Sequence, residues 1–324
     1  MSGVVKPGWR DVHGVLVLDK PKGVSSNQAL QKVRRLLSAR KGGHTGNLDP
    51  LATGVLPLCF GEATKYSHFL LDAEKTYLAE GVFGTLTDSG DCEGVEVRKA
   101  EPPEIDSESF ASLCHRFVGA GQQVPPMYSA LKHQGRPLYE LARKGIEIDR
   151  PPRDIVIHEC QPVSLNLPYF RFRVTCSKGT YVRTLIEDMA QSLGSLAHMT
   201  NLRREQSGPF SLQQAVTLEQ LESLLSDTPQ GVERLMANGV LMPIDSALTE
   251  IPTILVNFDQ GDSLICGRAV TLGDPRTCGL YRVYRNEDRM FLGVGKVTEP
   301  MRLSPFRLIS SGLIADNSKV LGRL

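Results

Sequence analysis

The sequence contains no Cys-x-x-Cys pair, although it has seven cysteines, at Cys59, Cys92, Cys114, Cys160, Cys176, Cys266 and Cys278. An odd number of cysteines at scattered spacings fits neither a zinc site nor a disulfide framework. Free thiols in a reducing compartment are the simplest interpretation. We therefore expect a cytoplasmic protein without a structural metal.

Long apolar runs are missing too. No uninterrupted run approaches the roughly 18 residues of a membrane span, and the N-terminal stretch MSGVVKPGWR lacks the apolar segment of a secretory signal. We expect no membrane partner. The chain also has no Walker A loop, no His-x-x-x-His pair and no Gly-x-Ser-x-Gly elbow. These absences argue against the commonest nucleotide-hydrolysing, zinc-protease and serine-hydrolase classes.

What is present is an ordinary globular composition. The 324 residues are 41% hydrophobic and 23% charged, which allows about two domains with sizeable cores. The net charge of +1 does not indicate a polyanionic partner, but residues 1–41 are basic and residues 88–108 are acidic. A positive face suited to phosphates and two differently solvated surfaces explain this asymmetry equally well.

Apolar periodicity predicts a series of strands and helices. Expected strands or core segments are His13–Asp19, Leu51–Phe60, Tyr77–Phe83 and Phe170–Cys176. Expected helices begin at Ser25 or Ser26, near Thr180 and at Thr217. A glycine-rich loop over residues 42–50 and an inserted loop-and-helix segment over residues 124–153 lie between them. Beyond about residue 248, short strands between turns predict a small β-rich domain; they are Ile254–Val256, Tyr281–Arg285 and Phe291–Val297.

The densest chemical signal is the segment GGHTGNLDPLATG at residues 42–54. Its glycines permit positive φ and let the backbone approach a ligand, and Pro50 pushes Asp49 toward an extended conformation. A carboxylate fixed in a tight loop between apolar Leu48 and Leu51 is a candidate reactive group. On the Asp-Pro pair alone, a turn in which Asp49 caps the next segment is the favoured interpretation.

Further segments hold other candidates. SKGTYVRT at residues 177–184 places Tyr181 and Arg183 in the first turn of a helix, where an arginine can hold a carboxylate ionised; an ordinary surface arginine is the alternative. Tyr77 opens a strand, a position more often core than catalytic. Arg203-Arg204 could place cations on phosphates, although such a pair usually marks a solvated face. PMYSALK at residues 126–132 suits unstacked bases and phosphates, or packing on the host domain.

Four blocks together resemble the TruB family of tRNA pseudouridine synthases in its bacterial form. They are GVLVLDKP (14–21) with Gly23 and Ser25-Ser26, GHTG through Gly54 (43–54), MYSALK (127–132) with Gly135 and Leu138-Tyr139, and Cys176 through Arg183. The likeness runs from about residue 13 to 245. It implies an α+β pseudouridine synthase fold, with a mixed, largely antiparallel sheet and flanking helices. Residues 10–247 would be the catalytic domain, with residues 124–153 as an RNA-contacting insertion.

The C-terminal stretch, residues 248–324, resembles a PUA domain, an RNA-binding module that would hold the acceptor stem of tRNA. This weaker match rests on Gly267–Val270, Gly293–Gly295 and Leu303–Leu308. One position departs from the family: Asn47 stands where a small residue is usual. It lies two residues before Asp49 and could alter hydrogen bonding in the loop, but we expect activity to survive.

The resemblance also implies the site residues. Asp49 matches the catalytic aspartate, Arg183 the arginine that pairs with it, and Tyr77 the tyrosine that stacks on the target uracil and could remove its C5 proton. The remaining substrate-binding positions are His44, which would enter the T-loop and displace the base, Tyr181 and Leu202 at the base, Asp91 as a further polar group, and Lys20 as a structural and phosphate-side lysine.

The implied reaction turns the uridine at tRNA position 55, in the T-loop, into pseudouridine, with a monomer gripping the T-arm. The N1–C1′ bond breaks, the uracil turns and C5 is joined to C1′, so neither a cofactor nor a metal is needed. Asp49 could attack C1′, add to C6 or abstract the C2′ proton, and all three steps need the ionised carboxylate that Arg183 would favour. A tRNA-binding folding chaperone with little chemistry, and an N-glycosidase that releases uracil, are the alternatives.

Overall fold

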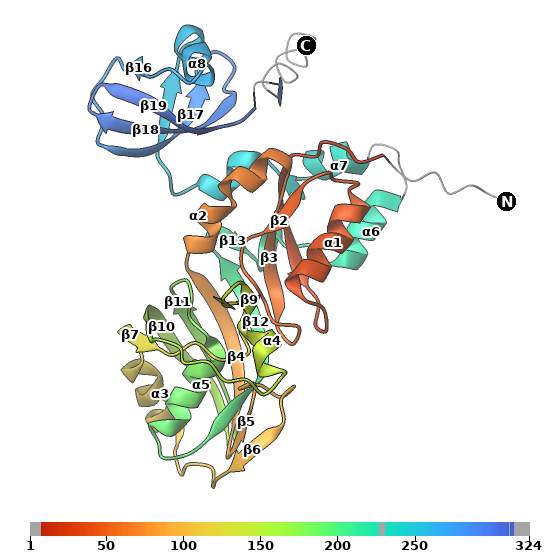
Figure 1. Ribbon diagram of the computed structural model, residues 1–324, viewed down its shortest axis with the longest axis vertical. Helices are drawn as coiled ribbons and strands as arrows, with labels where there is room; N and C mark the ends of the chain where they lie inside the picture. Colours follow the sequence, from red (N-terminus) through yellow and green to blue (C-terminus); the bar gives the residue numbers. More distant parts are fainter. Residues whose placement is uncertain (1–7, 227–230, 311, 314–324) are drawn as a thin grey trace, which may run out of the picture.

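The computed structural model describes residues 8–226, 231–310 and 312–313. Residues 314–324 of the expected C-terminal domain lie outside them, as do residues 1–7, on which the expectation about a secretory signal partly rests. Helices and strands gather into two units, each built around its own sheet (Figure 1). Within the described residues, no helix has the length and apolar character that crossing a membrane requires.

The larger sheet has ten strands in the described part of the chain. Its main path runs through β14 (Leu241–Met242), β1 (Gly14–Lys20), β3 (Thr53–Phe60), β12 (Ala197–Ser207), β4 (Lys75–Phe83), β11 (Tyr169–Cys176), β10 (Arg153–Asn166) and β7 (Gly119–Gln123), with β2 (Gly42–His44) on β3 and β13 (Phe210–Ser211) on β12. Within these residues β12 and β3 pair in parallel and the other pairings are antiparallel. The mixed, largely antiparallel sheet is therefore confirmed.

Helices cover one face of this sheet and share a core with it. The helices against β1 to β3 are α1 (Ser26–Leu36), α6 (Leu218–Ser226) and α7 (Gly231–Ala237), and those near β10 to β12 are α3 (Ser107–Arg116) and α5 (Val182–Gln191) (Figure 1). Val33 of α1 and Ile186 of α5 are fully buried in that core. The opposite face of β4, β11 and β12 is partly exposed and carries ion pairs, such as Arg173–Glu205 at 2.7 Å.

The predicted insertion is a loop with little regular structure. It holds β8 (Lys132–His133), β9 (Arg136–Pro137) and the short helix α4 (Leu138–Ala142). The remaining elements of the larger unit are β5 (Thr85–Thr87), β6 (Glu96–Lys99), α2 (Ser67–Asp72) and the 3-10 helices η1 (Gly61–Tyr66), η2 (Leu212–Gln214) and η3 (Ile244–Leu248).

Two sequence predictions change in detail. The segment Gly42–His44, predicted as loop, is a short strand on β3, because Gly42 faces Phe60 and a Cβ at Gly42 would lie only 3.0 Å from the Phe60 ring. The strand predicted from Tyr77 begins at Lys75, whose buried ammonium donates to the carbonyls of Leu70, Leu71 and Ala73. In both places, contacts from outside the segment decide the structure.

The C-terminal unit is a five-stranded sheet in the described chain, in the order β15 (Thr253–Val256), β17 (Gly279–Arg285), β18 (Phe291–Glu299), β19 (Arg302–Leu308) and β16 (Val270–Thr271), with α8 (Phe258–Ile265) beside it. It packs on the larger unit at η1. The Tyr66 hydroxyl donates to the Arg307 carbonyl at 2.9 Å, and the Ser310 amide donates to Glu62 Oε2 at 2.7 Å. The predicted C-terminal β-rich unit is confirmed.

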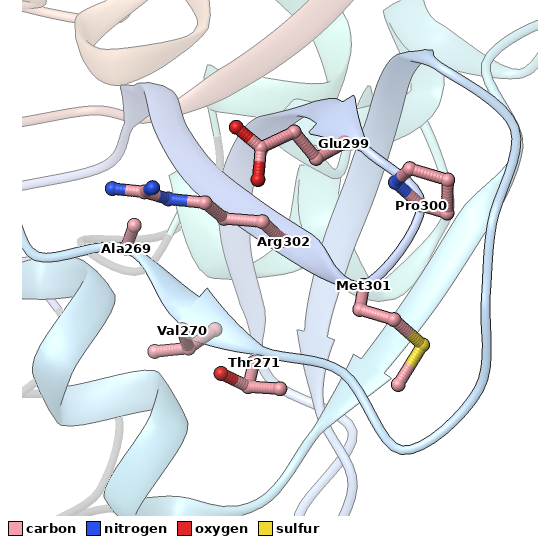
Figure 2. A pocket seen from close by; sticks show the side chains of 7 residues that line it. All are labelled: Ala269, Val270, Thr271, Glu299, Pro300, Met301 and Arg302. Atoms are coloured by element: carbon pink, nitrogen blue, oxygen red, sulfur yellow. The ribbon is translucent and has the colours of Figure 1, made fainter.

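A shallow pocket of about 600 Å³ lies on this unit. Its lining residues come from β16 and the residue before it, and from the end of β18, the turn that follows and the start of β19 (Figure 2); they are Ala269, Val270, Thr271, Glu299, Pro300, Met301 and Arg302. None of them is a residue that the sequence predicts for the reaction, so the hollow is separate from the candidate active site described next.

Candidate active site

The loop that carries Asp49 is tied to the start of α1. Ser25 caps this helix and forms a capping box with Gln28, which leaves the neighbouring Ser26 free for the loop. The Leu48 amide donates to Ser26 Oγ at 2.7 Å, and that hydroxyl donates to the Leu48 carbonyl at 3.1 Å. The residue before Asp49 is thus fixed on both of its main-chain polar groups.

Arg183 approaches Asp49 from the first turn of α5. Its Nη2 lies 3.0 Å from Asp49 Oδ2, and its Nη1 lies 3.7 Å from Asp91 Oδ2. The same guanidinium donates to the carbonyls of Ser89 and Tyr128, each at 2.7 Å. Only 5% of the arginine side chain is accessible. The predicted Asp49–Arg183 ion pair is therefore present, and three separate segments fix its cation.

The environment of Asp49 shifts the pKa of its carboxyl group in opposing directions. Burial among protein atoms raises this pKa, while the Arg183 charge and hydrogen bond lower it, and the net shift is upward. The side chain nevertheless keeps 41% of its surface accessible, so solvent that reaches the carboxylate limits the rise. The Asp49 carboxylate thus contacts the buried Arg183 cation on one side and is accessible to solvent on the other.

Asp91 completes this cluster from the turn after β5. Its Oδ1 accepts from the Ser89 hydroxyl at 2.7 Å and from the Glu93 amide at 3.1 Å. Gly90 between them has φ of +74°, and a Cβ there would lie 2.4 Å from Glu187 Oε1. The turn therefore requires glycine on both counts, and it brings Asp91 beside Arg183; the family resemblance implied Asp91 only as a further polar group of the site.

Tyr77 lies on β4 with its side chain 9% accessible. Burial raises the pKa of its hydroxyl, and the nearby Arg204 guanidinium lowers it. Arg204 itself is 1% accessible, so the solvated face expected for Arg203-Arg204 is wrong for this residue, as is a phosphate contact. Arg203 points the other way and pairs with Asp19 at 2.7 Å. The two neighbours differ because successive strand residues face opposite sides of a sheet.

His44 ends β2, and its environment favours the neutral imidazole. Burial lowers the pKa of its ring below the usual value, a hydrogen bond with the Gly46 backbone opposes this, and the Arg204 charge adds a smaller lowering. In the described chain Nδ1 is enclosed without a hydrogen-bond partner. The structure places His44 near the Asp49 loop, and its predicted role in displacing a base stays a prediction.

Lys20 does not face a phosphate. Its side chain is fully buried, and Nζ donates to the carbonyls of Pro21 at 2.9 Å, Val24 at 2.7 Å and Pro50 at 3.5 Å. Burial lowers the pKa of Lys20 to about 8, against the opposing charge of Asp49. The structural part of the prediction agrees with these bonds, by which the ammonium holds the Lys20–Val24 turn against the residue after Asp49. The substrate-binding part is corrected, because a fully buried ammonium has no surface for a phosphate.

Tyr181 and Leu202 occupy different environments. Tyr181 is the N-cap residue of α5. Its amide donates to Gln123 Oε1 at 2.8 Å, and Gln123 Nε2 donates to the Tyr181 carbonyl at 3.0 Å. Leu202 is 7% accessible and packs in the main core on β12. A direct contact of either residue with a base stays a prediction.

Sequence reasoning missed the roles of three residues that shape the site: Ser26, named only as a possible helix start, Arg204, named only as a possible phosphate contact, and Gln123, which was not named. Ser26 was hidden by its neighbour Ser25, because either serine fits a helix cap. Arg204 had a readable signal, a cation two residues after apolar Leu202 in a strand-like segment. Gln123 had none, because its partner Tyr181 is distant in the sequence.

No group of three or more His, Cys, Asp or Glu residues suited to a metal occurs in the part of the chain that the structure describes. The features that remain are a loop-borne carboxylate, a buried arginine behind it, a second carboxylate on that arginine, and a tyrosine beside them. This arrangement can hold an ionised carboxylate toward a molecule on the open side of Asp49.

Comparison with known proteins defines the class. Three family models match: the N-terminal domain of the TruB family pseudouridylate synthases over residues 34–182, the tRNA pseudouridylate synthase B C-terminal domain over residues 183–249, and the C-terminal domain of pseudouridine synthase II TruB over residues 252–309. The chain belongs to the TruB family, as its motifs predicted.

Individual relatives agree over nearly the full length. The tRNA pseudouridine synthase B of Stutzerimonas stutzeri (strain A1501) is 48% identical over 95% of this chain and 99% of its own. The proteins of the same name from Pseudomonas aeruginosa (strain UCBPP-PA14) and Methylobacillus flagellatus are 47% and 45% identical, over 95% and 93% of this chain and 99% and 96% of theirs.

Among solved structures, a chain in the crystal structure of a Cbf5–Nop10–Gar1 complex superposes with a TM-score of 0.70 at 22% identity, covering 94% of this chain and 91% of that one. A chain of the archaeal box H/ACA sRNP Nop10–Cbf5 complex gives a TM-score of 0.66 at 21% identity, over 93% and 91%. At this identity the likeness concerns the fold, and it confirms the pseudouridine synthase fold that the sequence predicts.

Proposed function

We propose that this protein isomerises a uridine in the T-loop of tRNA, at position 55, to pseudouridine, with Asp49 as the catalytic aspartate. The observation that carries the proposal is the 3.0 Å ion pair between Asp49 and the buried Arg183, in a chain of the TruB family. The names of its relatives, tRNA pseudouridine synthase B, supply the substrate class.

The proposed reaction requires three groups of the protein to act on the target nucleotide. The target base must leave its stack, at a cost of a few kcal/mol that is smallest in a loop, and neutral His44 is the residue proposed to take its place. Asp49 must be ionised to attack C1′, add to C6 or take the C2′ proton, and Arg183 lowers the pKa of its carboxyl group toward that state. Tyr77 is proposed to lie against the uracil and accept the proton that leaves C5.

The RNA contacts are proposed by unit. Residues 10–247 would hold the T-arm, with the insertion at residues 124–153 closing on it, and residues 248–324 would bind the acceptor stem. The contact of the Tyr128 carbonyl with Arg183 supports the insertion's part, since it joins that segment to the site. We propose that one copy suffices. A cytoplasmic location is proposed because all seven cysteines are free thiols.

The test is the product. Undermodified tRNA is incubated with the protein, digested to nucleosides and chromatographed, and the release of tritium from C5-labelled uridine is followed in parallel. We expect pseudouridine and tritium release with the native chain and neither with Asp49→Asn, while tRNA affinity stays within about threefold. Asp154→Asn, an exposed aspartate away from the cluster, is the control and should match the native chain.

The alternatives give other outcomes. Free uracil among the products would identify an N-glycosidase and overturn the proposal. A protein that only refolds tRNA would yield no pseudouridine, and its Asp49→Asn variant would behave as the native chain does. The assembled Asp49, Arg183 and Tyr77 favour the isomerase, because a folding chaperone has no use for a paired carboxylate.

A further inference from the structure

Arg204 is a charged residue without a counter-ion in the described chain. Its side chain is 1% accessible. Nε donates to the Val55 carbonyl at 2.6 Å and Nη1 donates to the Asn47 carbonyl at 3.5 Å. Nη2 is buried with no hydrogen-bond partner within 3.5 Å among the described residues, while the guanidinium lies close enough to the Tyr77 hydroxyl to interact with it. Burying a cation without a carboxylate is costly, so a role beyond packing is required to explain its presence.

Arg204 occupies the junction of three strands. It stands opposite Tyr77 in the antiparallel pairing of β12 with β4, and opposite Gly54 in the parallel pairing of β12 with β3. Opposed residues of neighbouring strands place their side chains on the same face. Gly54 has φ of +101°, and a Cβ there would lie 2.2 Å from the Arg204 carbonyl oxygen. Glycine at this position lets the two strands approach and fixes Arg204 beneath the Asp49 loop.

The charge of Arg204 acts on the two groups proposed to handle the base. Burial raises the pKa of the Tyr77 hydroxyl, and Arg204 is the charged neighbour that lowers it most; the Cys176 thiol and Asp49 act in the opposite direction. Burial lowers the pKa of His44, a hydrogen bond with the Gly46 backbone opposes this, and Arg204 adds a smaller lowering. The net shift of the Tyr77 pKa is upward, so the Arg204 charge reduces, without cancelling, the cost of forming a phenolate there.

We infer that Arg204 is a positioning residue for the proposed isomerisation: it fixes the turn before Asp49 through the Asn47 carbonyl, and it holds a positive charge beside the Tyr77 hydroxyl. The inference rests on the proposed function, because proton removal from C5 belongs to it. When the C5–H bond breaks, its electron pair stays in the uracil ring and the proton passes to the Tyr77 oxygen. Arg204 stabilises that oxygen in the state that accepts the proton.

The first experiment reads Tyr77 without RNA. Fluorotyrosine is incorporated at position 77 and its titration is followed by fluorine NMR in the native chain, in Arg204→Met and in Arg204→Lys. We expect the titration midpoint to move to higher pH in Arg204→Met and to stay near the native value in Arg204→Lys, which keeps the charge. Arg173→Met, an arginine paired on the opposite face of the sheet, is the control. An unmoved midpoint in Arg204→Met overturns the inference.

The second experiment reads catalysis. Single-turnover rates on tRNA should fall about tenfold to a hundredfold in Arg204→Met, a usual loss for a preorganised charge or a proton-transfer group, with KM changed less than twofold. The limb along which the rate rises as Tyr77 ionises should move to higher pH in that variant. Arg204→Lys should lose about tenfold with an unmoved limb, since the lysine cannot reach both carbonyls. A loss confined to KM, or a native rate in Arg204→Lys, counts against the inference.

The two arms separate the two proposals. If the native chain forms no pseudouridine, the proposed function fails, while the fluorine titration still decides whether Arg204 acts on Tyr77. If Arg204→Met does not fold, Arg204→Lys remains decisive through its rate and its KM: a native rate, or a loss confined to KM, overturns the inference.

Discussion

The guanidinium of Arg183 touches the carboxylate of Asp49 from its buried side, with Nη2 and Oδ2 3.0 Å apart. The arginine side chain is 5% accessible and the aspartate side chain 41%. The cation cannot move away without breaking its bonds to Ser89 and Tyr128. The pair is therefore a fixed charge behind a reachable one, an arrangement suited to holding an anionic group toward an incoming substrate.

Removing the Arg183 charge should slow the reaction and change its pH dependence. Arg183 lowers the pKa of Asp49, which burial has raised, so Arg183→Met should raise that pKa further. Because Asp49 acts as the ionised form, activity grows as pH rises through its pKa, and the acid limb of the profile should move to higher pH. At neutral pH we expect a loss of about a hundredfold. Single-turnover rates between pH 5 and 9 test this. The control is Arg171→Met, which removes an arginine paired with Glu80 on the exposed face of the sheet; the acid limb of its pH–rate profile should lie where that of the native chain does.

Ser26 and Ser25 offer a matched pair of substitutions. Ser26→Ala removes both hydrogen bonds to Leu48, so Asp49 should lose its position and kcat should fall about tenfold with KM unchanged. Ser25→Ala removes the helix cap and should lower the free energy of unfolding by about 1 kcal/mol with little effect on kcat. Steady-state kinetics and urea unfolding on both variants decide the matter. Equal kinetic losses would mean that Ser26 acts only through stability.

Glu187 should make stability depend on pH. Burial raises the pKa of Glu187 to about 7 from its usual 4.5, and Asp188 adds to the rise while Arg183 opposes it. A carboxyl group with a raised folded-state pKa stabilises the fold fully below pH 4.5, and this contribution is lost as pH rises through 7. Glu187→Gln, which cannot ionise, should therefore be more stable than the native chain at pH 8 by about 1–2 kcal/mol, after allowance for partial exposure.

Urea unfolding at pH 8 and pH 4.5 measures the difference for Glu187→Gln, which should shrink toward zero at the lower pH. A difference of equal size at both values would show that packing, rather than ionisation, separates the two proteins.

Asn47, the departure from the family pattern, should tolerate change. Its main-chain carbonyl accepts from Arg204, and its side chain is exposed. Asn47→Ala keeps the carbonyl, so the rate should stay within about twofold, as expected for a surface change away from packed groups. Asn47→Pro is the contrasting variant, since it restricts the backbone of that turn and should reduce the rate. Single-turnover assays on both variants test whether the backbone alone matters.

The sequence predicted an element correctly where the residues of that segment alone determine its conformation. The capping serine before α1 and the alternation of β11 are read within a few residues, and the blocks around Asp49 and Arg183 predicted their ion pair. β12 was not predicted, because register shifts after Met199 and after Arg204 interrupt its alternation. The phosphate-side position of Lys20 came from the family resemblance alone; its partners Val24 and Pro50 are loop carbonyls, which leave no pattern in the sequence.

The contact between η1 and β19 has a consequence for how the C-terminal unit is studied. Val15 and Tyr66 of the larger unit are fully buried in one apolar cluster with Leu292 and Val294 of the smaller one. Truncating the chain after residue 248 would strip that cluster and expose apolar surface on the catalytic unit. A loss of activity in such a fragment could then come from damaged packing as well as from lost RNA contacts. Charge reversals on the outer surface of the small sheet leave that cluster intact, so they test more directly whether this unit binds RNA.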